Sequence, residues 1–183
     1  PGSVGQPFPG VNIRLVDEAG DDVDSDGGDP GEIWIRGENL FSGYWPDGSD
    51  GPDEDGWYAT GDVAYLDTAG NLHLIDRRKE LIIVNGFNVY PREVELVLLE
   101  HRAVAEVAVL GVASVETGEA VKALVVLTPG STAAPSELAE HCAARLARFK
   151  RPSEIEIVDQ LPHSLLGKVA KGKLRQQLGE AQP

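Results

Sequence analysis

The charge of this sequence changes abruptly at one short segment, DRRKE, which spans residues 76–80. Residues 1–76 hold seventeen acidic and two basic side chains, whereas residues 77–183 hold thirteen acidic and fourteen basic ones. A step this sharp indicates two units with different surroundings, so we expect two small domains that meet at the DRRKE segment. The length of 183 residues allows this division. Taken alone, DRRKE is equally typical of a solvated turn after a strand. Its position between two differently charged halves favours a boundary between two domains.

The first unit is predicted to consist almost entirely of strands and turns. Apolar and β-branched runs bounded by turn residues predict strands at residues 11–16, 32–36, 63–66 and 72–75. The last two form a hairpin through a Gly-containing turn. Two acidic stretches, 21–30 and 47–55, are interrupted by Gly and Pro and are expected to be exposed loops. We therefore expect an antiparallel, β-barrel-like subdomain over residues 1–78.

The second unit, residues 79–183, is predicted to mix helices and strands. The turn Asn85-Gly86 joins two short apolar strands in a hairpin. Pro91 begins a helix that continues through residues 92–100, and Ser136 is expected to cap a second helix. The apolar stripe of that second helix consists of Leu138, Cys142, Leu146 and Phe149. Further strands are predicted at residues 106–112, 121–127 and 155–158. This order predicts a small α+β domain around a three-stranded sheet.

Asp62 and Arg77 are candidates for binding a ribose. Asp62 follows Gly61 at the predicted end of a turn, where a carboxylate can accept hydrogen bonds from a diol or serve as an Asx-type turn residue. Arg77 lies at the far end of the predicted hairpin. Because a hairpin brings its ends together, we expect the two side chains to be close, either as an ion pair or sharing one ribose.

Lys168 is the candidate in the second unit for binding a phosphate or carboxylate oxygen. It follows Gly167, and a glycine there lets the backbone approach a ligand while the ammonium reaches a phosphate or carboxylate oxygen. The alternative is a solubilising basic tail, because Lys171, Lys173 and Arg175 follow closely. The local sequence alone favours the tail.

Composition excludes several classes of protein. No apolar run approaches the roughly eighteen residues of a membrane span, and the N-terminus lacks the basic and apolar regions of a secretory signal. The absence of methionine indicates a segment of a longer or processed protein. Cys142 is the single cysteine, which favours a reducing compartment, and the four histidines show no metal-ligand spacing. The acidic first half argues against a nucleic-acid partner.

Four motifs occur in a characteristic order. They are Tyr58–Asp62 (YATGD), Asp76–Ile82 (DRRKELI), Gly86–Glu95 (GFNVYPREVE), and Leu161-Pro162 followed by Gly167-Lys168. In this order they closely resemble the adenylate-forming superfamily, which includes acyl-CoA synthetases, 4-coumarate-CoA ligases, luciferases and nonribosomal adenylation domains. The resemblance covers essentially the whole chain. It implies that residues 1–78 are the last β-subdomain of a large N-terminal AMP-binding domain and that residues 79–183 are its C-terminal lid.

The resemblance also implies residue roles for the activation of a carboxylic acid by ATP. Asp62 and Arg77 match the pair that holds the AMP ribose, and Asn88 occupies a position near the phosphate. Lys168 matches the catalytic lysine that bridges the carboxylate and the α-phosphate. The phosphate loop and the acidic segment that binds Mg²⁺ lie upstream of residue 1 in the family, so this segment alone is not expected to catalyse a complete reaction.

The remaining implied roles belong to the second half-reaction, in which CoA accepts the acyl group. Lys79 matches the hinge about which the lid rotates between an adenylating and a thioester-forming pose. Gly86 and Phe87 match the loop that lines the path of the CoA pantetheine arm. Ile83 stands where several relatives carry a lysine.

The sequence therefore predicts the C-terminal part of an acyl-CoA ligase. Its expected partners are ATP, Mg²⁺, CoA, a fatty acid and the N-terminal AMP-binding domain, together with a lysine acetyltransferase acting on Lys168. A cytoplasmic location is expected, with peripheral membrane association left open. Two alternatives remain: an adenylation domain or acyl-AMP ligase that hands the acyl group to a carrier protein, and a non-catalytic module that binds a nucleotide or a partner.

Overall fold

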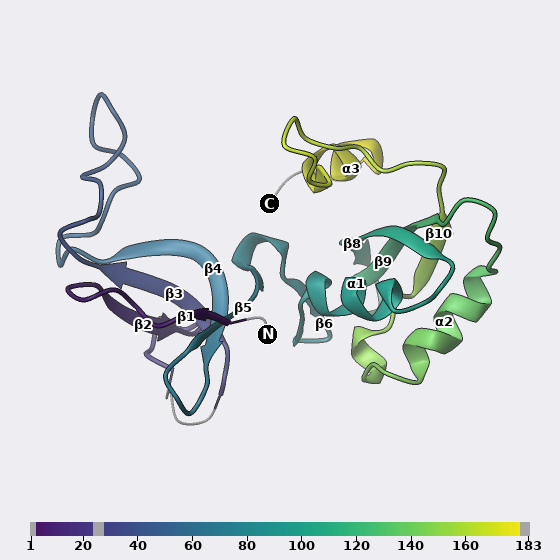
Figure 1. The fold of residues 1–183 in the computed structure, drawn as a ribbon, viewed down its shortest axis with the longest axis horizontal. Helices are drawn as coiled ribbons and strands as arrows, with labels where there is room; N and C mark the ends of the chain where they lie inside the picture. The colour runs from purple at the N-terminus through teal and green to yellow at the C-terminus, as the bar shows by residue number, and fades with distance from the viewer. Residues whose placement is uncertain (1–2, 24–27, 180–183) are drawn as a thin grey trace. The chain divides into compact units, whose positions relative to one another are not determined.

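The chain forms two compact units, Pro1–Arg78 and Lys79–Pro183, in a computed structural model (Figure 1). The structure describes residues 3–23 and 28–179. The predicted loop at residues 21–30 therefore lies partly outside the described residues.

The first unit is a five-stranded antiparallel sheet with the strand order β1-β5-β4-β3-β2 (Figure 1). Its strands are β1 (Ser3–Gly5), β2 (Asn12–Val16), β3 (Gly31–Arg36), β4 (Tyr58–Leu66) and β5 (Leu72–Arg77). The apolar positions of these strands form a core centred on Leu15, Ile33, Ala64 and Leu72. The predicted antiparallel sheet and its β4–β5 hairpin are confirmed.

The second unit is an α+β domain, as predicted. Its helices are α1 (Pro91–Leu99), α2 (Pro135–Ala143) and α3 (Lys171–Gln177), with a short 3-10 turn at Arg148–Lys150. Another 3-10 turn, Arg78–Glu80, spans the boundary between the units. Its strands are β6 (Ile82–Val84), β7 (Phe87–Val89), β8 (Val104–Ser114), β9 (Gly118–Leu127) and β10 (Glu154–Ile157). Strand β9 pairs antiparallel with β8 and parallel with β10. The sheet has five strands where the sequence predicted three, because the β6–β7 hairpin joins β9 through Val84 and Gly118.

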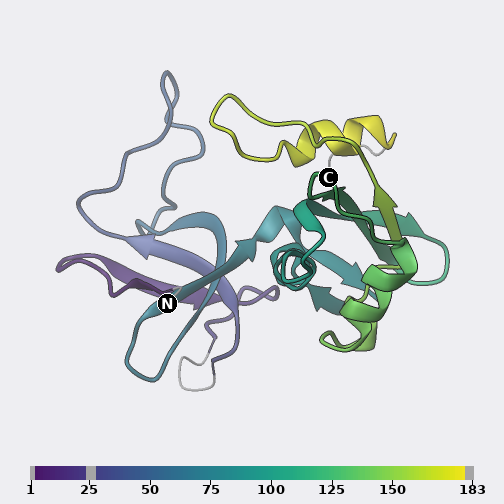
Figure 2. The same cartoon turned by 45° about the vertical axis from the view of Figure 1, so that its right-hand side comes forward.

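The sheet of the second unit is buried on both faces at β8, because alternate residues of this strand enter two different cores. Val107 and Val109 belong to the larger core, which includes residues of α1 and α2. Ala108 and Leu110 belong to a smaller core with Leu174 of α3. Figures 1 and 2 accordingly show α3 apart from α2.

Two local predictions are corrected by the structure. Ser136 does not cap α2: the N-cap is Ala134, no side chain caps the helix, and Pro135 occupies its first turn. A proline there loses no helical hydrogen bond and has its φ already set for the helix. The basic segment 167–175 is not a solvated tail either, since most of it forms α3 and buries Leu174.

No helix within residues 3–23 and 28–179 is both long and apolar enough to cross a membrane.

Candidate functional site

Asp62 and Arg77 face each other across the β4–β5 hairpin. The two residues are register partners, and the Arg77 Nε lies 2.6 Å from the Asp62 Oδ1. The predicted proximity is therefore confirmed. Asp62 lies inside β4, however, not at the end of a turn as the sequence suggested. Both side chains remain partly exposed, at 31% for Asp62 and 59% for Arg77, so a ligand could reach them.

A bulge in β4 sets the direction of Asp62. The register of β4 shifts against both neighbouring strands near this point, and Gly61 has a φ of +74°, which favours glycine. The Thr60 hydroxyl donates to the Ile33 carbonyl at 2.9 Å and accepts from the Asp62 amide at 3.1 Å. The TGD sequence thus folds as a hydrogen-bonded bulge that presents a carboxylate at the sheet surface.

Glu32 is a buried carboxylate that the sequence analysis did not identify. One of its oxygens, Oε1, accepts a hydrogen bond from the Gly61 amide at 3.1 Å. The other, Oε2, pairs with the Arg78 guanidinium and accepts from the Trp34 indole at 3.3 Å. Glu32 therefore binds Gly61, which precedes Asp62, and Arg78, which follows Arg77.

Removing the charge of Glu32 is expected to destabilise the first unit. Glu32→Gln leaves the Arg78 guanidinium beside an uncharged amide, so the free energy of unfolding should fall by about 1–3 kcal/mol. All three tryptophans, Trp34, Trp45 and Trp57, lie in the first unit, so their fluorescence during urea unfolding measures this change. Glu38→Gln, at an exposed position shortly after β3, is the matched control and should change stability by less than about 0.5 kcal/mol. Equal stability of the two variants would show that Glu32 contributes nothing through its charge.

Lys168 lies in a small hairpin, residues 163–169, which we call the Lys168 hairpin. His163 and Val169 form an isolated β-bridge, and the Ser164 amide donates to the Lys168 carbonyl at 2.8 Å. The Gly167 amide donates to the Ser164 carbonyl at 2.9 Å, and Gly167 has a φ of +77°. The hairpin therefore has a defined backbone, and it holds Lys168 in an exposed position.

Lys79 lies at the boundary between the two units, and Gly86 lies in a tight turn. Lys79 is exposed within the 3-10 turn Arg78–Glu80 and is the first residue of the second unit. Asn85 and Gly86 have φ angles of +51° and +80°, as in the tight turn of a two-residue hairpin between β6 and β7. Asn88 lies on the exposed face of this hairpin opposite Ile83.

A cavity of about 510 Å³ lies next to the Gly86 turn. Its lining includes Asn85, Thr117, Arg148, Phe149 and Arg151. The Phe87 ring stacks on the Phe149 ring, with 4.8 Å between the ring centroids. The sequence predicts Leu146 and Phe149 on the apolar stripe of α2, but both follow the last residue of the helix, Ala143, and Phe149 lies in the turn Arg148–Lys150. The three cations that flank Phe149 in residues 148–151 are the signal that could have indicated this pocket.

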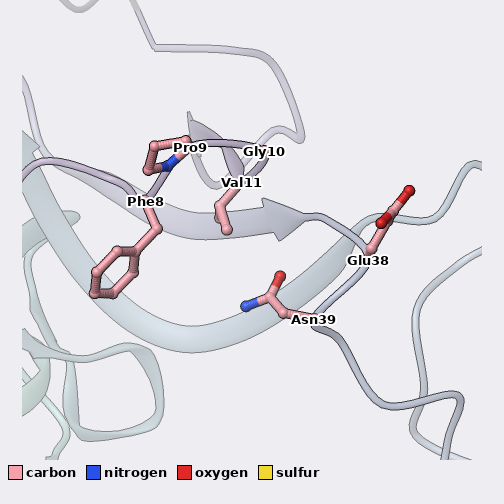
Figure 3. Close-up of a pocket in the computed structure, with 6 residues that line it drawn as sticks. All are labelled: Phe8, Pro9, Gly10, Val11, Glu38 and Asn39. Atoms are coloured by element: carbon pink, nitrogen blue, oxygen red, sulfur yellow. The ribbon is translucent and has the colours of Figure 1, made fainter.

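The first unit has a pocket of its own, of about 520 Å³, drawn in Figure 3. Phe8 and Asn39 border its open space, and Glu38 is the one carboxylate among the described residues that line it. These described residues include no cation and no pair of groups suited to acid–base or nucleophilic chemistry. The Asp62–Arg77 pair, the Lys168 hairpin and the Gly86 turn are therefore the stronger candidates.

In the part of the chain that the structure describes, neither Cys142 nor a cluster of metal ligands forms a competing site. Cys142 is fully buried, and this burial raises the pKa of its thiol to about 11, as expected for a core cysteine. Within residues 3–23 and 28–179, no group of three or more His, Cys, Asp or Glu residues is placed to hold a metal ion.

Two family models match parts of this chain. The family model of the AMP-binding enzymes matches residues 1–45. The model of the AMP-binding enzyme C-terminal domain matches residues 93–168, and Lys168 is the last residue of that match. The chain belongs to the AMP-binding enzyme family.

Its relatives include curated enzymes and solved structures. The long-chain-fatty-acid–CoA ligase of Yersinia pestis is 46% identical over 176 residues, which are 95% of this chain. The chain spans only 31% of the length of that relative. ATP-bound MatB from Rhodopseudomonas palustris is 38% identical with a TM-score of 0.88, over 97% of this chain and 36% of MatB. Apo MatB gives a TM-score of 0.68 with the same coverage and 39% identity. The Bacillus subtilis o-succinylbenzoate CoA synthetase in complex with its acyl-adenylate intermediate is 37% identical, with a TM-score of 0.84 over 98% of this chain and 36% of the synthetase.

Proposed function

We propose that this chain is the C-terminal part of an ATP-dependent acyl-CoA ligase. The proposed reaction joins a carboxylic acid to AMP with release of pyrophosphate, and then transfers the acyl group to the CoA thiol. The Asp62–Arg77 pair carries the proposal, because in an AMP-binding enzyme it offers a carboxylate and a guanidinium to a ribose. The similarity to a long-chain-fatty-acid–CoA ligase supports a long-chain fatty acid as the substrate.

The two units have different proposed places in the complete enzyme. We assign residues 1–78 to the last β-subdomain of the N-terminal AMP-binding domain and residues 79–183 to the C-terminal lid. The contact boundary between Arg78 and Lys79 supports this assignment.

In the first half-reaction, this chain supplies groups for the nucleotide and for the developing charge. Asp62 accepts hydrogen bonds from the ribose hydroxyls, and Arg77 shares the same ribose. Lys168 places its ammonium between the substrate carboxylate and the α-phosphate, with Asn88 near the phosphate. Mg²⁺ would neutralise phosphate charge when bound, but the described residues offer no set of ligands for it, so we assign it to the N-terminal part.

In the second half-reaction, the β6–β7 hairpin guides CoA. Gly86 and Phe87 line the pantetheine path, and the neighbouring cavity takes the nucleotide end of CoA. One feature supports the second assignment: Arg148 and Arg151 line this cavity, and their guanidinium groups can pair with phosphates.

Lys79 is the proposed hinge between the two half-reactions. The support comes from MatB, whose ATP-bound and apo structures match this chain with TM-scores of 0.88 and 0.68. The two MatB structures therefore differ from one another in the region that this chain covers. A lid that rotates would let one site use Lys168 first and the Gly86 turn second.

The charge of Lys168 also makes it a proposed point of regulation. A lysine acetyltransferase acting on this exposed side chain would remove the cation that adenylation requires.

Pyrophosphate release by the complete enzyme tests the proposed function. The enzyme would be offered ATP and a panel of carboxylic acids of increasing chain length, with and without CoA. We expect pyrophosphate to depend on a long-chain acid, and a thioester to form only when CoA is present.

Each other outcome selects a different function. An acyl-adenylate that never passes to CoA would contradict the ligase and favour transfer to a carrier protein. No pyrophosphate with any acid would contradict adenylation altogether and favour a non-catalytic module.

A further inference from the structure

Two cationic side chains of α3 are bound by carboxylates from other parts of the second unit. Lys171 and Arg175 lie one helical turn apart. The Lys171 Nζ is 2.7 Å from the Glu95 Oε1 in α1. The Arg175 guanidinium contacts both oxygens of Glu80, at 2.5 Å and 3.3 Å. One face of α3 is thus fixed to two separate segments of the chain.

Both carboxylates are in surroundings where losing a partner is costly. Glu95 is only 6% exposed, and it also accepts a hydrogen bond from the Val109 amide at 3.1 Å, with Arg92 3.8 Å away. The side chains of Glu80 and Arg175 are 12% and 13% exposed. A charge this shielded from water depends on its partner, so these ion pairs hold their geometry more firmly than surface pairs do.

The ion pairs connect the proposed hinge with the proposed catalytic lysine. Glu80 directly follows Lys79, and α3 begins three residues after Lys168. The Ala170 amide, just before α3, donates to the Pro162 carbonyl at 2.7 Å and closes the base of the Lys168 hairpin. Leu161 and Leu174 are buried together below this base. The position of α3 therefore determines where the Lys168 hairpin lies within the second unit.

We propose that Glu80 and Glu95 are positioning residues for Lys168. They hold α3 in place through their ion pairs with Arg175 and Lys171, which we call the clamp. As a result α1, α3, the Lys168 hairpin and the residues directly after Lys79 move as one body. A rotation at Lys79 then moves Lys168 by the same rotation. This matters because the Lys168 ammonium must lie within hydrogen-bonding reach of its target. This inference rests on the proposed function for the role of Lys168, but the clamp itself rests on the contacts of α3.

The test compares the half-reactions of the complete enzyme after the clamp is opened. Arg175→Gln should lower the kcat of acyl-adenylate formation by about 10- to 100-fold, because Lys168 loses its fixed position. Thioester formation from a supplied acyl-adenylate should stay within about twofold of wild type, because it does not use Lys168. The reversed pair Glu80→Arg/Arg175→Glu should recover most of the lost adenylation.

Lys173→Gln is the matched control, because Lys173 is an exposed cation of the same helix. It should leave both half-reactions unchanged. A merely structural role for the clamp predicts equal losses in both half-reactions and no recovery in the reversed pair, and that result would overturn the proposal. Unchanged adenylation in Arg175→Gln would overturn it as well.

Hydrogen exchange separates failure of the clamp from failure of the proposed function. In Arg175→Gln, the amides of Gly167 and Ala170 should exchange at least about tenfold faster, while amides of β8 and β9 keep their protection. If the wild-type enzyme releases no pyrophosphate, the proposed function fails, and the exchange of these two amides still decides on the clamp. Unchanged exchange at both amides would show that the ion pairs do not hold the Lys168 hairpin.

Discussion

Replacing Lys168 by alanine in the complete enzyme is expected to lower the kcat of acyl-adenylate formation by about 10²–10³-fold. Thioester formation from a supplied acyl-adenylate should remain within about twofold of wild type. The reason is that Lys168 is a point charge at an exposed place in a hydrogen-bonded hairpin, where it can stabilise charge that develops between a carboxylate and a phosphate. A thiol attacking the finished adenylate needs other groups, so the loss should be confined to the first half-reaction.

Pyrophosphate release and thioester formation, measured separately, check this division of roles. Lys173→Gln serves here too as the control for loss of a nearby positive charge. Enzyme acetylated at Lys168 should behave like Lys168→Ala, because acetylation removes the same charge. An equal loss in both half-reactions would contradict the split role, and full activity of the acetylated enzyme would contradict the proposed regulation.

Some elements of the secondary structure followed directly from local sequence signals. The Asn85-Gly86 turn set the β6–β7 hairpin, and Pro91 set the start of α1. The cap of α2 was assigned wrongly because Ser136 is a strong capping residue, yet the proline before it had already fixed the first turn. The C-terminal segment was misjudged locally because its charges are conspicuous, whereas one leucine, Leu174, decides its packing.

Part of the candidate site could likewise be predicted from the sequence, and part could not. Asp62 and Arg77 could be brought together from the sequence, because a hairpin makes the distance between its ends predictable. The ion-pair partners of Glu32 and Glu80 could not be predicted from the sequence. Arg78 is 46 residues from Glu32, and Arg175 is 95 residues from Glu80. An ion pair across such a distance leaves no periodicity in the sequence. Its existence depends on how sheets and helices pack, which composition and spacing do not specify.

Lys79→Pro should produce the opposite pattern to Lys168→Ala. Proline fixes φ near −65°, so the backbone at the proposed hinge loses the rotation that changes the pose of the lid. If the variant is held in the adenylating pose, acyl-adenylate formation should continue near the wild-type rate. Thioester formation should fall by about 10²-fold, because the Gly86 turn no longer reaches its working position.

The effect of Lys79→Pro on the hinge has to be separated from its effect on the neighbouring residue Arg78. Proline also disfavours a helical conformation at the residue before it, which is Arg78, the partner of buried Glu32. The adenylation rate checks this effect, because damage there would reach Arg77 and lower ribose binding. Lys79→Ala removes the side chain without restricting the backbone, so it should keep both half-reactions. Normal overall turnover in Lys79→Pro would mean that residue 79 is not the point of rotation, and a loss shared by Lys79→Ala would mean that the lysine side chain acts by itself.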